Sequence, residues 1–186
     1  YMIYPNLCYL GTKYKYSNFE IQYDLFDMKN TPTTHADGRP ILPSHWHQLS
    51  WGTDGDSAYG VASSYSAAYQ LIFETGVDLD PNSPTYLQRI PGGGLSVHFY
   101  DHGAWSGAYE IPGKYAFNQA GFDPETRVQI RLVNIDGSAI LYMKLSTETN
   151  WTEIWRHAYK NGIMPLGYVA IRTEGNQYTG TRLAYY

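Results

Sequence analysis

The sequence predicts an all-β protein whose strands form a two-sheet antiparallel sandwich. Three observations lead to this prediction. About eleven short segments alternate apolar and polar residues, which is the period of a half-buried strand. Turn signals recur about every 8 to 12 residues, as they do in sandwiches and barrels. No stretch carries the sustained pattern of a long helix.

The clearest of these segments is a hairpin over residues 127–145. In 128–133 every second residue is apolar, and the alternation resumes on the return strand, 138–145. Asp136 and Gly137 lie between the two runs, and this pair readily adopts the positive φ that a tight hairpin turn needs.

Two further strands are expected after this hairpin. One carries Trp151, Glu153 and Trp155, and Trp155 is expected to pack between the sheets. A turn over 160–165 leads to the other, within 167–173. Four antiparallel strands in succession form a meander, and a meander with one apolar face must pack on a second sheet.

The other elements follow from local signals. Pro5 predicts that the first strand lies at an edge, because proline cannot donate to an inner ladder. Residues 61–75 fit both a helical stripe and an alternating strand, and we interpret them as a loop that leads into a strand over 68–74. The remaining predicted strands are 2–10, 18–27, 95–100, 106–111 and 181–185, and the predicted loops and turns are 29–43, 52–60, 77–90, 92–94, 101–105, 121–126 and 175–176.

Length and composition fit one domain over residues 1–186. Because the chain begins at Tyr1 without a signal peptide, we expect a domain excised from a larger protein or a processed chain. Cys8 is the only cysteine, so it is expected to be a small buried apolar side chain. Nineteen tyrosines and five tryptophans accompany a low charged fraction of 16%, a composition common in binding surfaces and in sheets.

Several classes of function are excluded by the same numbers. The net charge is −4 and no basic run exists, so nucleic acid is not expected as a partner. No apolar run approaches the roughly 18 residues of a membrane span, so membrane insertion is not expected. The glycines at 92–94 lack the Gly-Lys-Ser/Thr of a phosphate loop, and no Gly-x-Ser-x-Gly elbow exists.

Three stretches carry a family resemblance: Asn-Phe-Glu-Ile-Gln-Tyr-Asp-Leu at 18–25, the hairpin at 128–142, and Pro-Leu-Gly-Tyr-Val-Ala-Ile-Arg-Thr at 165–173. Together they resemble the concanavalin-like lectin/glucanase superfamily, the laminin-G-like jelly rolls. The resemblance implies a jelly roll with glycans on its concave face or on the loops at its rim. It also implies an extracellular or cell-surface location. Lectins, carbohydrate-binding modules, glycoside hydrolases and polysaccharide lyases share this fold, which does not choose among them.

Two clusters combine aromatic rings, which can stack on sugar faces, with polar groups that can bind hydroxyls. Both flank predicted loops, where function tends to concentrate. Their aromatic residues can equally be core residues of a sandwich. The candidate ligand-binding residues are Trp46 and Trp51 in one cluster, with His45, His47 and Gln48 beside them, and His98, Tyr100, Asp101, His102, Trp105 and Tyr109 in the other. Trp105, in a predicted turn bounded by glycines, is the tryptophan expected to be exposed.

Catalysis has only weak signals. Glu20 and Asp24 share a strand face but lie about 13 Å apart along it, beyond the separation of a glycosidase pair. A solvated polar face explains them, unless a neighbouring strand adds a carboxylate. A lyase could use His98 and Tyr100 with Arg131 or Arg172 to hold a substrate carboxylate, although many tyrosines make such a set easy to find by chance. No catalytic residue is therefore assigned.

Metal binding is the last alternative. Many sandwich domains of this kind carry calcium, and Asp78 with Asp80, or the Asp54-Gly-Asp56 turn, offer oxygen ligands. An aspartate that caps its own turn is the simpler interpretation. The spacing of His45 and His47 could chelate zinc, but it lacks a third ligand at a fixed spacing.

The hypothesis that these observations favour is a non-catalytic, lectin-like carbohydrate-binding domain of a secreted or surface protein. Its motivation is the jelly-roll pattern, the two aromatic clusters and the lack of a catalytic carboxylate motif. The alternatives are a polysaccharide-active hydrolase or lyase on the same fold, and a structural or adhesive protein whose tyrosines make self-association contacts.

Overall fold

The computed structural model describes residues 3–4, 7–26, 33–34, 40–41, 46–53, 69–75, 84, 95–116, 127–174 and 182–185. Within these ranges, side chains are described for 11–24, 47–52, 69–73, 84, 95–116 and 127–171.

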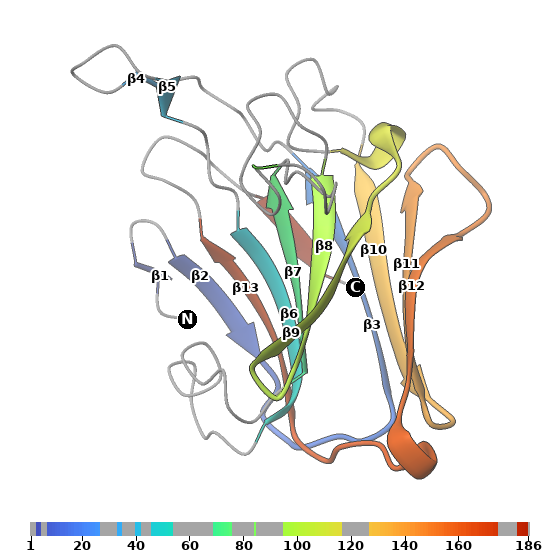
Figure 1. Ribbon diagram of the computed structural model, residues 1–186. Helices are drawn as coiled ribbons and strands as arrows, with labels where there is room; N and C mark the ends of the chain where they lie inside the picture. Colours follow the sequence, from blue (N-terminus) through green and yellow to red (C-terminus); the bar gives the residue numbers. More distant parts are fainter. Residues whose placement is uncertain are drawn as a thin grey trace.

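The strands form two antiparallel sheets that face each other, as Figure 1 shows. The predicted all-β, two-sheet antiparallel sandwich is confirmed. The seven-stranded sheet has the order β1 (Ile3–Tyr4), β2 (Leu7–Gly11), β13 (Tyr168–Glu174), β6 (Trp46–Thr53), β7 (Tyr69–Thr75), β8 (Leu95–Asp101) and β9 (Ala104–Glu110). The five-stranded sheet has the order β12 (Thr152–Ala158), β11 (Ser138–Leu145), β10 (Val128–Ile135), β3 (Phe19–Phe26) and β14 (Arg182–Tyr185). A separate pair, β4 (Thr33–Thr34) and β5 (Pro40–Ile41), lies within the segment predicted to be a loop.

Helical structure in the described part of the chain is limited to two 3-10 turns, η1 (Gly113–Tyr115) and η2 (Lys160–Gly162). None of the described helices has the length and apolarity of a membrane span. Residues 61–75 fitted both a helix and a strand in the sequence, and the structure has a strand at their end, because β7 begins at Tyr69. Residues 61–68 lie outside the described ranges.

The predicted hairpin is present as β10 and β11, paired from Val128 with Leu145 to Ile135 with Ser138. Its turn residues have positive φ, 53° at Asp136 and 76° at Gly137, as the Asp-Gly pair predicts.

The predicted four-strand meander is wrong in its last strand. β10, β11 and β12 are consecutive neighbours, but β13 joins the other sheet, where it pairs with β2 and β6. Val169 and Ile171 are buried in the core from that side. An apolar face looks the same in either layer, so the alternation alone does not say which sheet a strand enters.

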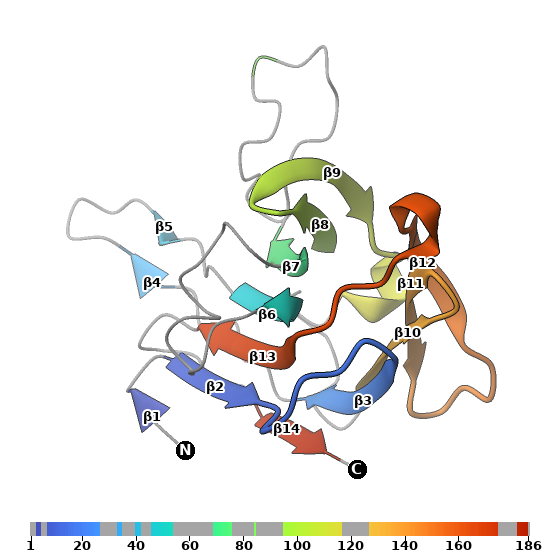
Figure 2. The ribbon, with the colours of Figure 1, turned by 90° about the horizontal axis from the view of Figure 1, so that it is seen from below.

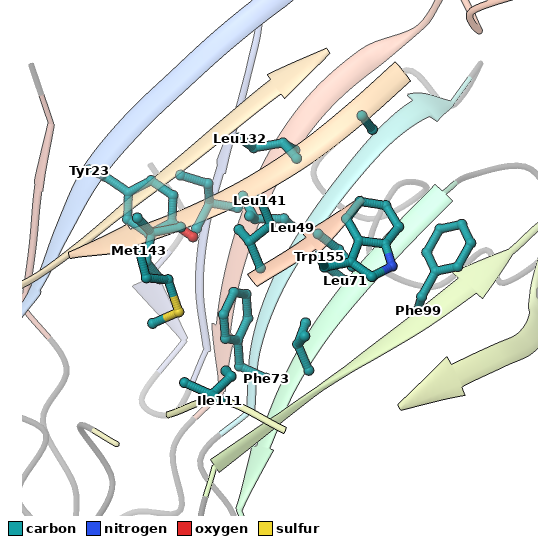
Figure 3. Packing of buried hydrophobic residues seen from close by; sticks show 14 of the residues in the cluster. Tyr23, Leu49, Leu71, Phe73, Phe99, Ile111, Leu132, Leu141, Met143 and Trp155 are labelled. Carbon is teal, nitrogen blue, oxygen red and sulfur yellow. The ribbon is translucent and has the colours of Figure 1, made fainter. Parts of the chain in front are cut away.

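The core lies between the sheets, and Figure 3 shows its packing. Leu49, Leu71 and Phe73 enter it from the seven-stranded sheet, while Leu132 and Leu141 enter it from the other sheet. Trp155, which the sequence placed between the sheets, is almost fully buried there, in accordance with that prediction.

The seven-stranded sheet is curved. Seen from below in Figure 2, the strands from β1 to β9 follow an arc with the five-stranded sheet on its convex side. The outer face of the seven-stranded sheet is therefore its concave face.

Candidate functional site

The concave face of the seven-stranded sheet carries polar side chains that are almost fully buried. In β6, His47, Leu49 and Trp51 are buried between the sheets, because successive side chains alternate along a strand. Gln48 and Ser50 consequently lie on the concave face, and they are only 1% and 2% exposed. A buried polar group needs a hydrogen-bond partner to offset its lost hydration, so these two residues require an explanation.

β8 contributes a second set of polar residues to the same face. Val97 and Phe99 are buried in the core. The residues that alternate with them, Ser96, His98 and Tyr100, are therefore on the concave side, and Ser96 and His98 are buried there. The Ser96 hydroxyl is hydrogen-bonded to His98 Nε2 at 3.2 Å.

One register row joins these positions across five strands. Ile72 pairs with Gln48 on one side and with His98 on the other, and Gln48 also pairs with Arg172 of β13. Ala108 of β9 completes the row opposite His98. Because neighbouring strands lie about 4.8 Å apart, the backbones of Gln48 and His98 are separated by about 10 Å.

Gln48 has a side-chain acceptor that the protein leaves open. Its Nε2 donates to the Ser50 hydroxyl at 2.6 Å. Its Oε1 has no hydrogen-bond partner among the residues that the structure describes. An unpaired buried acceptor costs about 1–3 kcal/mol, a cost that a bound donor such as a hydroxyl would offset.

A second register row, two residues along each strand from the first, contains several glutamate positions. Glu74 pairs with Ser96, which pairs with Glu110, and Glu174 pairs with Trp46. Glu74 and Glu110 occupy positions two strands apart, about 10 Å between backbones. This row cannot be recognised in the sequence, because glutamates on separate strands carry no motif until the register is known.

Trp105 lies at the edge of the concave face. A register irregularity in β9 pairs Trp105 with Tyr100, and Trp105 is 43% exposed. Its predicted exposure is confirmed, although it stands in strand β9 and not in the predicted turn. Tyr109 pairs with the core residue Val97, so it lies on the opposite face of β9, where it is 39% exposed. The two aromatic candidates of this strand are thus separated by the sheet.

Asp101 and His102 lie at one end of the sandwich. His102 and Gly103 form the β8–β9 turn with φ of 48° and 80°, and His102 Nδ1 is 2.5 Å from Asp101 Oδ1. The His102 ring packs edge-on against Tyr69, with 4.9 Å between centroids. Burial, and then the nearby Asp101 carboxylate, raise the pKa of Tyr69.

The first aromatic cluster is divided between core and surface. Trp51 is fully buried, and its Nε1–H donates to the Tyr159 hydroxyl at 2.5 Å. His47 is buried beside Tyr23, with a hydrogen bond between its Nε2 and the tyrosine hydroxyl. Trp46 is placed by register alone, opposite Glu174. His45 lies outside the described residues, so Gln48 is the member of this cluster whose described side chain belongs to the concave face.

Glu20, Asp24 and Arg131 belong to the outer face of the other sheet. Arg131 donates to both carboxylate oxygens of Glu20 at 2.8 Å, and the hydrogen bond from Arg131 lowers the pKa of Glu20. Asp24 is buried and accepts a hydrogen bond from Gln129 at 3.0 Å. These contacts fit a structural role for the pair. Among the residues that the structure describes, Arg172 is the arginine whose backbone position falls in the register row of His98.

A metal site is not formed by the described residues, among which no three His, Cys, Asp or Glu side chains are grouped to hold an ion. His47 and His98 lie on opposite faces of their sheet, so they cannot share a zinc ion. The calcium candidates Asp54, Asp56, Asp78 and Asp80 lie outside the described residues.

No family model matches the sequence, and no curated protein is significantly similar to it. Solved structures are similar in fold. The exoplasmic/lumenal domain of VIP36, in a form bound to Ca2+ and Man2, superposes with a TM-score of 0.52 at 11% identity, over 94% of this chain and 67% of that domain.

Two other structures show lower similarity. Scytalido-glutamic peptidase, with a peptide-based transition-state analog, has a TM-score of 0.45 at 9% identity, over 97% of this chain and 71% of the peptidase. Metal-free lectin I-B4 from Griffonia simplicifolia has a TM-score of 0.43 at 10% identity, over 96% and 94% of the two chains. The likeness to the VIP36 domain concerns the fold alone, a jelly-roll β-sandwich, and a fold does not determine a function, so function must be argued from the site.

Proposed function

We propose that this protein binds glycans without cleaving them, on the concave face of its seven-stranded sheet. The observation that carries the proposal is the open Oε1 acceptor of buried Gln48, in one register row with His98 and on the same face as exposed Trp105. Sugar hydroxyls donate and accept hydrogen bonds, and the apolar face of a sugar ring stacks on an indole. This face offers both kinds of contact.

The first test uses the two faces of β9. Trp105→Ala is expected to weaken polysaccharide binding by about tenfold or more, because it removes the stacking surface. Tyr109→Ala is the matched control, since it removes a similarly exposed ring from the opposite face of the same strand. Affinity gel electrophoresis over mannan, β-glucan and alginate measures both variants. Equal losses in both, or no binding by the wild type, would count against the proposal.

A second variant separates ligand binding from packing. Gln48→Leu removes the open acceptor but keeps the side chain close in size, so folding stability should change little. Glycan affinity should fall if a hydroxyl donates to Oε1. Unchanged affinity in this variant would remove Gln48 from the site.

The second candidate function is a polysaccharide lyase or hydrolase at the same place. The register favours it specifically, because Arg172, Gln48 and His98 share one row and Glu74 and Glu110 share the next. In a lyase, Arg172 would hold a uronate carboxylate while His98 removed the proton next to that carboxylate. The bond to the leaving sugar oxygen would break as the new double bond formed, and water would protonate that oxygen. New reducing ends would identify a hydrolase, and absorbance of unsaturated uronate would identify a lyase.

We also propose calcium as a candidate cofactor, with Asp54, Asp56, Asp78 and Asp80 as its candidate ligands. Carboxylate oxygens from such loops are its preferred ligands. Binding is to be measured in calcium and in EDTA, and loss of glycan binding in EDTA is the expected result for a calcium-dependent site. The proposed location is extracellular or at the cell surface, where glycan partners are displayed.

A further inference from the structure

Five of the seven large apolar side chains that are exposed in the described part of the chain gather at one end of the sandwich. Four of them stand on two connections, and the fifth is the last residue of β10, beside a third connection. Ile163 is 73% exposed, and Leu166 and Tyr14 are each 62% exposed. Tyr16 and Ile135 complete the set, which we call the apolar end.

The three connections form one surface. Tyr16, between β2 and β3, exchanges two backbone hydrogen bonds with Gly167, between β12 and β13, at 2.8 and 3.1 Å. The β10–β11 turn joins them through a bond of 2.9 Å from Tyr159 N–H to the Gly137 carbonyl. Figure 1 shows these connections together at the lower end of the molecule.

The three connections of the apolar end hold more lysines than acidic residues, although the whole chain carries a net charge of −4. These connections hold Lys13, Lys15 and Lys160, against a single acidic residue, Asp136. Lys13 Nζ lies 5.5 Å from the ring centroid of Tyr14. Lysine and tyrosine alternate in sequence over residues 13–16, and these residue types occupy the boundary between lipid headgroups and acyl chains.

We propose that the apolar end docks on the surface of an anionic lipid membrane, without spanning it. Ile163, Leu166 and Tyr14 would enter the headgroup region, and the lysines would contact lipid phosphates or carboxylates. A second copy of this chain fits less well, because two ends that each hold more lysines than acidic residues would repel each other. A partner that adds a strand or lays down a helix needs a continuous edge or groove, and separate loop tips do not provide one.

The test is co-sedimentation of the purified chain with lipid vesicles. Binding to phosphatidylcholine vesicles with about 30% phosphatidylserine is expected to exceed binding to phosphatidylcholine alone by about tenfold or more. It should weaken as salt is raised, because screening reduces attraction between exposed charges. The paired substitution Ile163→Glu and Leu166→Glu should abolish binding, and Lys13→Gln with Lys15→Gln should remove the preference for anionic lipid.

Thr147→Glu provides the control, since it adds a negative charge to the exposed β11–β12 turn at the other end of β11. It should bind vesicles slightly less tightly than the wild type at most, and thermal unfolding of each variant checks that it is folded. The proposal is overturned if the wild type does not sediment with anionic vesicles at low salt, or if Thr147→Glu loses binding as fully as the paired variant. A concentration-dependent dimer that the paired variant abolishes, without vesicle binding, would identify a self-contact and would also overturn it.

Discussion

His47 is a titratable side chain in the middle of the core, packed between the rings of Tyr23 and Phe73 at centroid distances of 5.3 and 5.2 Å. Burial lowers its pKa from 6.5 to about 3. Its Nδ1 finds no hydrogen-bond partner within the described ranges, so a proton on that nitrogen would gain no hydrogen bond to offset its burial.

This burial predicts a loss of stability in mild acid. The unfolded chain takes up a proton at His47 near pH 6.5, while the folded chain resists until about pH 3. The stability linked to His47 is therefore fully present above pH 6.5 and is lost as the pH falls toward 3, by about 1.4 kcal/mol per pH unit.

Urea unfolding between pH 4.5 and 6.5 measures the effect, with His47→Phe as the variant that cannot titrate. Burial also lowers the pKa of His157, which contributes in the same direction in both proteins. The difference between the two slopes therefore isolates His47. Parallel slopes would show that His47 does not set the acid sensitivity.

His47 also shows how much of this region could be predicted from the sequence. His47 and Trp51 attracted a binding interpretation because aromatic and imidazole groups cluster there, but both fill the core. The alternating partners Gln48 and Ser50 form the concave face. Alternation identifies the two faces of β6, but with aromatic and imidazole side chains on one of them it does not say which face is buried.

At the scale of elements, Gly52 fixes the irregular pairing of β6 with β13. Thr53 pairs with Tyr168 and Ser50 with Ala170, so Trp51 and Gly52 together lie opposite one residue, Val169. This is the two-against-one arrangement of a β-bulge, and Gly52 has a φ of 74°.

Gly52→Ala is expected to destabilise the fold by at least about 2 kcal/mol. A β-carbon there would lie 2.7 Å from Cβ of Pro165, in a backbone conformation that alanine disfavours. Gly113→Ala is the control, because a β-carbon there would meet nothing within 4 Å. Urea unfolding compares the two, and similar midpoints for both variants would contradict this account of the bulge.

Elements were predicted well where local chemistry decides them. The β10–β11 hairpin followed from alternation and an Asp-Gly turn, both of which act between neighbours in sequence. The position of β13 could not be predicted in this way. The turn after β12 carries the chain across to the other sheet, and only long-range packing specifies that crossing. The row of Arg172, Gln48 and His98 depends on that crossing, so the sequence alone could not assemble the site.

At the scale of the whole molecule, the concave face and the apolar end use different parts of the fold. Trp105 lies on β9, four strands from β13 in the sheet order, or about 19 Å along the sheet. Leu166 lies just before β13, and no described contact joins it to Trp105. Distant substitutions without shared partners act additively.

The two proposed sites should therefore be separable. Trp105→Ala should lower glycan affinity and leave vesicle binding unchanged, while Ile163→Glu with Leu166→Glu should do the reverse. The protein that carries all three changes should lose both activities by the same factors as the separate variants. A loss of vesicle binding in Trp105→Ala would mean that the surfaces are coupled or that one surface serves both ligands.

A membrane that carries both anionic lipid and glycan could be bound at both proposed sites. The β8–β9 turn, which precedes Trp105, and the connections of the apolar end lie at the same end of the molecule in Figure 1. A vesicle with tethered glycan could then engage both, and the second contact would become intramolecular, which raises apparent affinity by about 10² or more. Wild-type protein should therefore bind glycan-bearing anionic vesicles far more tightly than either single-site variant does, whereas avidity is lost if geometry forbids both contacts at once.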